Sequence, residues 1–243
     1  MFDNLRLAIA RALIPSKYKL PEATASLIRA ANRSGRELDL DSSIDINIDL
    51  ETWGLTPGSA IRSIGAFATS LTASIHGEKT FSTYIHDKSC EAAGLTIDPG
   101  TVEWWENQSE KAKDQFHGSY KFSLEEALIG LNQWIVELVF ETSHGAMSPI
   151  TVHVWGNGAV MDIALIEAAY RAVNLKPAWE WWASQDCRTI ERLSQQAGLD
   201  FRRSIEIEGE LHVALNDAMA QGKRTSAGQE SLLALVRLGK ALM

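Results

Sequence analysis

Two carboxylates, Asp49 and Glu51, stand two residues apart in a segment whose polar and apolar residues alternate strictly. Such alternation is typical of a β-strand, and on a strand both carboxylates would project from one face, about 7 Å apart. Like charges held together there repel each other, and a bound divalent metal ion is the usual compensation. An edge strand with a solvated outer face is the simpler alternative, and it would need no metal. The other charged residues of the chain must decide between a metal site and a solvated edge strand.

The strand that carries these carboxylates is predicted to have one face in a core. Its apolar positions are Ile44, Ile46, Ile48 and Leu50, and its polar positions are Asp45, Asn47, Asp49 and Glu51. Because side chains alternate between the faces of a strand, the apolar set would face the core and the polar set the opposite side.

A third carboxylate, Asp162, heads the apolar face of a helix predicted from about residue 159 to 173. The residues that follow it on this face are all apolar: Leu165, Ile166, Ala169 and Val173. A carboxylate in that position must be paired, must cap the helix or must bind a metal. Capping is the plain alternative, because an acidic residue in a first turn is stabilised by the helix dipole.

His212 and Asp217 form the last candidate pair. Five residues of one helix turn through about 500°, so the two side chains would not share a face if both were helical. A loop at His212 that runs into a helix carrying Asp217 would let both reach one point. A histidine that is merely packed or solvated remains the alternative.

In this order, Asp49-x-Glu51, Asp162 and His212-x-x-x-x-Asp217 resemble the DEDDh branch of the DEDD 3′→5′ exonucleases, which have a ribonuclease H-like fold. Within that branch the chain is similar to the bacterial and phage exonuclease VIII-like, or 3′–5′ exoribonuclease-like, family. The similar segments are residues 49–54, 60–66, 101–105 with 108–109, 155–158 and 186–189. The resemblance covers residues 45 to about 222, and residues 1–43 have no counterpart. Met161 and Val213 depart from the family, which has Phe before the third acid and Asn or Arg after the histidine.

The resemblance implies a phosphodiesterase that uses two Mg²⁺ or Mn²⁺ ions. Asp49 would bind both ions. Glu51 and Asp217 would complete the site of the ion beside the attacking water. Asp162 would hold the ligands of that site or bind through water. Such hard cations prefer oxygen ligands, which suits four carboxylates. His212 would be the general base, because an imidazole titrates near neutral pH.

The substrate implied by the resemblance is single-stranded DNA or RNA with a free 3′ end, or a short overhang. Thr52, Trp53 and Gly54 follow the strand directly and are candidates to hold the terminal nucleotide, with the indole against its base. Core packing is the alternative for Trp53. An endonuclease and a noncatalytic nucleic-acid-binding module of the same fold remain alternative functions. The motifs do not distinguish DNA from RNA. Relatives in this family are often dimers, so a homodimer is an open alternative for this chain.

The rest of the sequence predicts an α/β (mixed) fold, with an N-terminal helical appendage at 1–43 and a ribonuclease H-like domain at 44–243. Strands are expected at 44–51, 61–69, 80–85 and 151–155, and helices at 2–13, 22–31, 101 onward, 123–140, 159–173, 187–197, 214–221 and 228–242. The helix at 123 opens with a Ser123-x-x-Glu126 capping box, and the last helix is given Ser226 as its cap. Three antiparallel strands come first, so we expect a central mixed sheet flanked by helices.

Composition narrows the class of protein. The chain has 243 residues and a net charge of −8, which argues against nonspecific wrapping around duplex nucleic acid. Its two cysteines are too few for a disulfide framework and favour a reducing compartment, so a cytoplasmic location is expected. No apolar run approaches the length of a membrane span, and no membrane association is expected.

Overall fold

The computed structural model describes residues 42–72, 75, 77–117, 120–142, 150–206 and 208–241. These residues fall into two compact units: 42–187 with 208–222, and 188–206 with 223–241. The predicted appendage of residues 1–43 lies outside the described residues except for its last two. The domain boundary expected at residue 44 therefore stays a prediction.

The larger unit is built on a mixed sheet, which in the described part has six strands in the order β4-β3-β2-β1-β5-β6. The strands are β1 (Ser43–Thr52), β2 (Ile61–Thr69), β3 (Lys79–Ile85), β4 (Lys121–Phe122), β5 (Thr151–Gly156) and β6 (Ser184–Asp186). β1, β2 and β3 form an antiparallel meander, β5 runs parallel to β1, and β6 runs parallel to β5. The expected central mixed sheet, with three antiparallel strands first, is confirmed.

Helices of the larger unit flank this sheet, as expected. The helices of the described residues are α3 (Asp87–Ala92), α4 (Pro99–Glu106), α5 (Glu110–Asp114), α6 (Leu124–Thr142), α7 (Asp162–Ala172), α8 (Cys187–Gln196), α9 (Phe201–Ser204) and α10 (Ala214–Ala241). Of these, α9, α8 after its first residue and α10 from residue 223 belong to the smaller unit. The predicted capping box opens α6: the Ser123 N–H donates to Glu126 Oε2 at 2.8 Å, and the Glu126 N–H donates to Ser123 Oγ at 3.3 Å. Among the described residues, no helix is long and apolar enough to cross a membrane.

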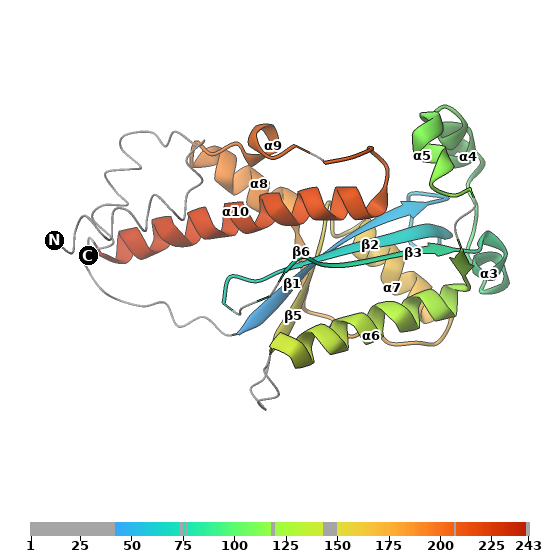
Figure 1. The fold of residues 1–243 in the computed structure, drawn as a ribbon, viewed down its shortest axis with the longest axis horizontal. Helices are drawn as coiled ribbons and strands as arrows, with labels where there is room; N and C mark the ends of the chain where they lie inside the picture. Colours follow the sequence, from blue (N-terminus) through green and yellow to red (C-terminus); the bar gives the residue numbers. More distant parts are fainter. Residues whose placement is uncertain are drawn as a thin grey trace. The chain divides into compact units, whose positions relative to one another are not determined.

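Both faces of β1 are covered. The isoleucine face packs in one core with α6 and α7, which lie along the same side of the sheet in Figure 1. The polar face was expected to lie outside the core, yet Asp45, Asn47 and Glu51 are also buried. The first turns of α10 account for part of this, because a side chain at Gly222 would meet Phe67 and Asn47. The edge-strand alternative is wrong, since β1 lies between β2 and β5.

α10 corrects the prediction of two helices separated near residues 222–227. It is one continuous helix, so Ser226 caps nothing. Gly222 lies inside this helix, and its missing side chain serves close packing: a Cβ there would lie 3.0 Å from Asn47 Nδ2. In the smaller unit, Gly228 has the same use, because a Cβ there would lie 2.5 Å from Ile190 Cγ2. Also in that unit, Arg224 Nε donates to the Ile205 carbonyl at 2.9 Å.

Gly65 lets the start of α10 approach the sheet, and this gives a stability prediction. A Cβ at Gly65 would overlap the backbone of Ala214 and Leu215, so Gly65→Ala should destabilise the protein by about 1–3 kcal/mol through overpacking. Gly130→Ala in α6 is the matched control: its Cβ would make ordinary contact with Phe81 at 3.7 Å, and alanine favours the helix. Urea unfolding of both variants checks this, and an unchanged midpoint for Gly65→Ala would contradict the close approach.

Candidate active site

Asp49 and Glu51 lie near the carboxyl end of β1, on the polar face. Asp49 pairs across the sheet with Gly65, the residue on which α10 begins its approach. Glu51 pairs with Ser63, and the register shifts between Glu51 and Thr52. Glu51 is only 6% exposed, so its carboxylate is largely withdrawn from water. The strict alternation of the sequence thus places both acids on one face, as expected.

Asp162 reaches this region from the next strand. β5 runs parallel to β1, so the two strands end at the same edge of the sheet. The chain turns after Gly156 and enters α7 at Asp162, which lies so close to Gly156 that a Cβ there would come within 3.1 Å of the Asp162 Cβ. Asp162 is 5% exposed, and its Oδ2 accepts a hydrogen bond from the Asn157 N–H at 3.1 Å. α7 starts three residues later than expected, so Asp162 is its first residue.

His212 lies in the loop before α10, and Asp217 lies in the first turn of that helix, as expected. The His212 N–H donates to Asp217 Oδ2 at 3.0 Å, which ties the loop to the helix start. Glu51, His212 and Asp217 each offer one ligand atom, and these atoms all lie within 4.8 Å of one another. A strand and a loop that are about 160 residues apart in sequence thus meet at one point.

The electrostatics tie the remaining carboxylates to this point. Burial, above all, raises the pKa of Asp49 well above its ordinary value, and repulsion from Asp162, Glu51 and Asp217 raises it further. Burial likewise raises the pKa of Glu51 from 4.5 to about 8, with Asp217 adding to the effect and Arg62 opposing it. Asp162 and Asp217 therefore act on both Asp49 and Glu51, and without a cation the protonated forms of Asp49 and Glu51 are favoured.

Gln221 belongs to this cluster although sequence reasoning missed it. Its Nε2 donates to Asp49 Oδ1 at 2.7 Å. This bond lowers the pKa of Asp49, although burial and the neighbouring carboxylates outweigh it. Gln221 lies one turn after Asp217, on the same face of α10. The i, i+4 spacing from Asp217 is the sequence signal that would have identified it.

The residues predicted to hold the substrate lie just beyond the carboxylates. Thr52 is buried, and its hydroxyl donates to the Gly54 carbonyl at 2.7 Å. The Trp53 N–H donates to the Ala60 carbonyl at 2.8 Å, so that amide is engaged within the fold. The Trp53 indole N–H donates to Asp87 Oδ1 at 2.8 Å. These bonds hold the segment in place within the fold. The core-packing alternative therefore explains much of the position of the Trp53 side chain.

A comparison of the whole chain with protein families decides the class. The family model described as the 3'-5' exoribonuclease Rv2179c-like domain matches residues 45–229. The chain belongs to this Rv2179c-like family. It is accordingly a 3′–5′ exonuclease, a phosphodiester hydrolase whose substrate is nucleic acid, and the noncatalytic alternative is disfavoured.

Other comparisons are more distant. No curated protein matches the chain. Among solved structures, the chain is similar to the nuclease domain of 3'hExo, a DEDDh family member solved bound to rAMP. The two share 12% sequence identity with a TM-score of 0.47, over 77% of this chain and 92% of that one.

Arg62 is a second residue of this Rv2179c-like domain that sequence reasoning missed. Its guanidinium carbon lies 3.9 Å from the ring centroid of Trp53, 4.4 Å from that of Trp105 and 3.6 Å from that of Phe116. Burial lowers its pKa to about 10, and the neighbouring Asp87 and Glu51 oppose this shift. Its Nη1 has no hydrogen-bond partner among the described residues, so aromatic faces, rather than acceptors, hold the cation.

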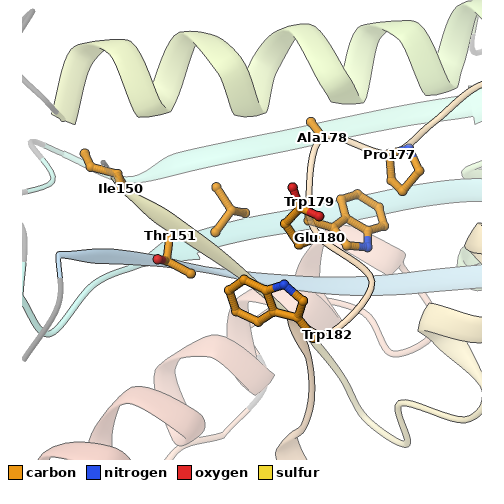
Figure 2. A pocket seen from close by; sticks show the side chains of 8 residues that line it. Ile150, Thr151, Pro177, Ala178, Trp179, Glu180 and Trp182 are labelled. Carbon is orange, nitrogen blue, oxygen red and sulfur yellow. The ribbon is translucent and has the colours of Figure 1, made fainter. Parts of the chain in front are cut away.

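A pocket of about 300 Å³ opens at the other end of the sheet (Figure 2). Its lining consists of Ile150, Thr151, Val152, Pro177, Ala178, Trp179, Glu180 and Trp182. Thr151 is the first residue of β5, whereas Asp162 follows the last, so the length of the strand separates the pocket from the carboxylates. The pocket is therefore not part of the acidic site.

The raised pKa of Glu51 predicts how pH acts on the metal-free Rv2179c-like domain. Between pH 4.5 and about 8 the folded protein retains a proton that unfolded Glu51 has lost. The contribution of Glu51 to the free energy of unfolding should therefore be largest below pH 4.5 and fall as pH rises through about 8, by at most about 1.4 kcal/mol per pH unit for one proton. Urea unfolding in EDTA from pH 5 to 8 measures this.

Glu51→Gln is the control for this prediction, because it removes the titrating group and nearly keeps the shape of the side chain. Subtracting its profile from that of the native protein isolates the contribution of Glu51. Parallel profiles for the two proteins would contradict the raised pKa of Glu51.

Proposed function

We propose that this protein is a divalent-metal-dependent exonuclease that removes nucleotides one at a time from the 3′ end of single-stranded RNA. The convergence of Glu51, His212 and Asp217 within 4.8 Å, at the strand end that also carries Asp49, supports this most directly. The family description favours RNA over DNA.

The donor set fits Mg²⁺ or Mn²⁺. Asp49, Glu51, Asp162 and Asp217 would hold two such ions, because carboxylate oxygens are the ligands that hard cations prefer. The mutual repulsion that raises the pKa of Asp49 would be offset by the added positive charge. When bound, the ions would lower the pKa of the attacking water and stabilise the leaving 3′-oxygen.

The protein's own residues would complete the reaction. His212 would accept the proton of the attacking water as general base, while its N–H bond to Asp217 keeps the loop at the site. Asp217 would thus both bind a cation and orient the base. Gln221 would hold Asp49 in one rotamer through its 2.7 Å bond.

Substrate contacts would come from Thr52, Trp53 and Gly54, which follow Glu51 directly. Since the Trp53 amide is already bonded to Ala60, the sugar would be held by the neighbouring backbone, and the indole would contact the terminal base. The indole of Trp53 is preorganised for this by Asp87 and Arg62.

Polarity gives the test of the proposal. A site that accepts a free 3′-hydroxyl should degrade a 5′-labelled oligoribonucleotide into a ladder that shortens from the 3′ end. The same strand ending in a 3′-phosphate should be cut at least about tenfold more slowly, because a buried acidic site disfavours a further dianion. A deoxy strand of the same sequence measures the preference for RNA. Equal cutting of free and blocked strands would identify an endonuclease instead.

The homodimer and the cytoplasmic location stay predictions. Neither cysteine forms a disulfide and both are buried, as a reducing compartment allows. Light scattering on the purified protein at two concentrations tests the dimer.

A further inference from the structure

Residues 98–117, which contain α4 and α5, form a small helical segment that we call the cap. Figure 1 shows α4 and α5 near the end of β1 that carries the carboxylates. The segment begins on the chain next to the site, because the Asp98 N–H donates to the Trp53 carbonyl at 2.7 Å. Asp98 then caps α4 by accepting the Thr101 N–H at 2.8 Å.

One side of the cap is fixed to the strand ends. The buried Trp105 donates its indole N–H to the Thr52 carbonyl at 2.9 Å. The guanidinium of Arg62, from β2, packs against both Trp105 and Phe116 of the cap. These contacts place the cap relative to Glu51, which directly precedes Thr52.

The other side of the cap contacts the loop that carries His212. Gln115 Nε2 donates to the His212 carbonyl at 2.5 Å, and Ser109 Oγ donates to Glu210 Oε1 at 2.8 Å. The ring of Trp104 lies 5.0 Å from that of His212 between centroids, at 86°, which is an edge-to-face contact. These contacts join residues about 100 positions apart in the chain.

The backbone of His212 explains why such contacts are needed. Its φ is +60°, a left-handed conformation that a residue with a side chain adopts at a cost. The surroundings must therefore hold it there: Asp217 binds the N–H from one side, and Gln115 binds the carbonyl from the other. Release of either group would let the residue return to negative φ and carry its ring away from Glu51 and Asp217.

We infer that Gln115 is a positioning residue for His212, and that the cap sets the geometry of the catalytic base from the strand side of the site. The inference rests on the proposed role of His212 as general base. Gln115 acts through the backbone of His212, whose carbonyl accepts its amide N–H. Its loss should slow the chemical step and leave substrate binding nearly unchanged.

Gln115→Leu tests this, because it keeps the side-chain size and removes the donor. We expect kcat on a 5′-labelled oligoribonucleotide to fall about 10–100-fold, the scale for groups that orient a catalytic residue, while KM stays within about threefold. Gln108→Leu is the matched control: within the described residues, the amide of Gln108 bonds to the cap itself, at the Trp104 carbonyl, 3.0 Å away. It should stay within about twofold of the native kcat.

A readout independent of activity is the ring C–H resonance of His212 in a ¹H–¹³C correlation spectrum, assigned by its disappearance in His212→Ala. Gln115→Leu should shift or broaden this resonance, and Gln108→Leu should not. Should Gln115→Leu fail to fold, Ser109→Ala provides the second variant, since Ser109 is exposed; it should move the same resonance in the same direction by a smaller amount.

The outcomes separate the two ideas. If His212→Ala retains nearly native turnover, the proposed general base is wrong. If His212→Ala is impaired, but Gln115→Leu keeps the native kcat and the native His212 resonance, the inference about Gln115 is overturned. It is also overturned if Gln115→Leu costs as much turnover in the His212→Ala background as alone, because a positioning residue has no effect once its target is gone.

Discussion

Asp49→Asn should abolish turnover and at the same time raise the melting temperature of the metal-free protein. Burial is the main cost of a charge on Asp49, and repulsion from Asp162, Glu51 and Asp217 adds to it. Asparagine has nearly the same shape and removes that charge, so the apo fold is relieved of repulsion. Catalysis should fall by at least about 10²–10³-fold, the scale for losing one preorganised electrostatic group.

Asp45→Asn is a matched control, because Asp45 lies on the same face of the same strand. Asp45 is also buried, but it accepts the Trp155 indole N–H at 2.7 Å and faces His153 at 3.5 Å. Its neutralisation should lower the melting temperature. Differential scanning fluorimetry in EDTA compares the two, and adding Mn²⁺ should stabilise the native protein more than Asp49→Asn. A destabilised Asp49→Asn apo protein would contradict the repulsive cluster.

Local patterns predicted the parts of the fold that they control. The alternation of β1 and the short connections after β1 and β2 were sufficient to predict the antiparallel meander, because parallel neighbours would need much longer connections. The apolar stripe and capping box of α6 were likewise sufficient, and its stripe residues Leu124, Leu128, Leu131, Ile135 and Leu138 are all buried. The spacing of the acids and the histidine then indicated which residues form the site.

Long-range packing explains what the sequence did not reveal. Gly222 resembles a helix end by itself, and only its contact with Phe67 and Asn47 makes it a helix interior residue. Arg62 was missed because its partners are three aromatic faces, and cation–π contacts leave no characteristic spacing. The short elements α3, α5, α9, β4 and β6 have too few residues for any periodicity to be detected.

His212→Ala should lower turnover by about 10²–10⁴-fold, the usual contribution of a general base. The potential ligand atoms of Glu51, His212 and Asp217 lie within 4.8 Å of one another, and a water between them would be within reach of the imidazole. The four carboxylates remain in this variant. Cation binding measured by calorimetry and strand binding measured in Ca²⁺ should therefore stay within a few-fold of the native protein.

The variants at His212 must separate the loss of the imidazole from a change in the backbone of the loop that carries it. His212 has a left-handed backbone, so alanine there also carries a conformational cost, and glycine does not. His212→Gly should therefore be at least as stable as His212→Ala, with the same deficit in turnover if the imidazole is what matters. A His212→Gly protein rescued by added imidazole would assign the proton transfer to the ring itself. Turnover within a few-fold of native for both variants would contradict the general base, and His212 would then serve only as the loop residue on which Trp104 and Gln115 pack.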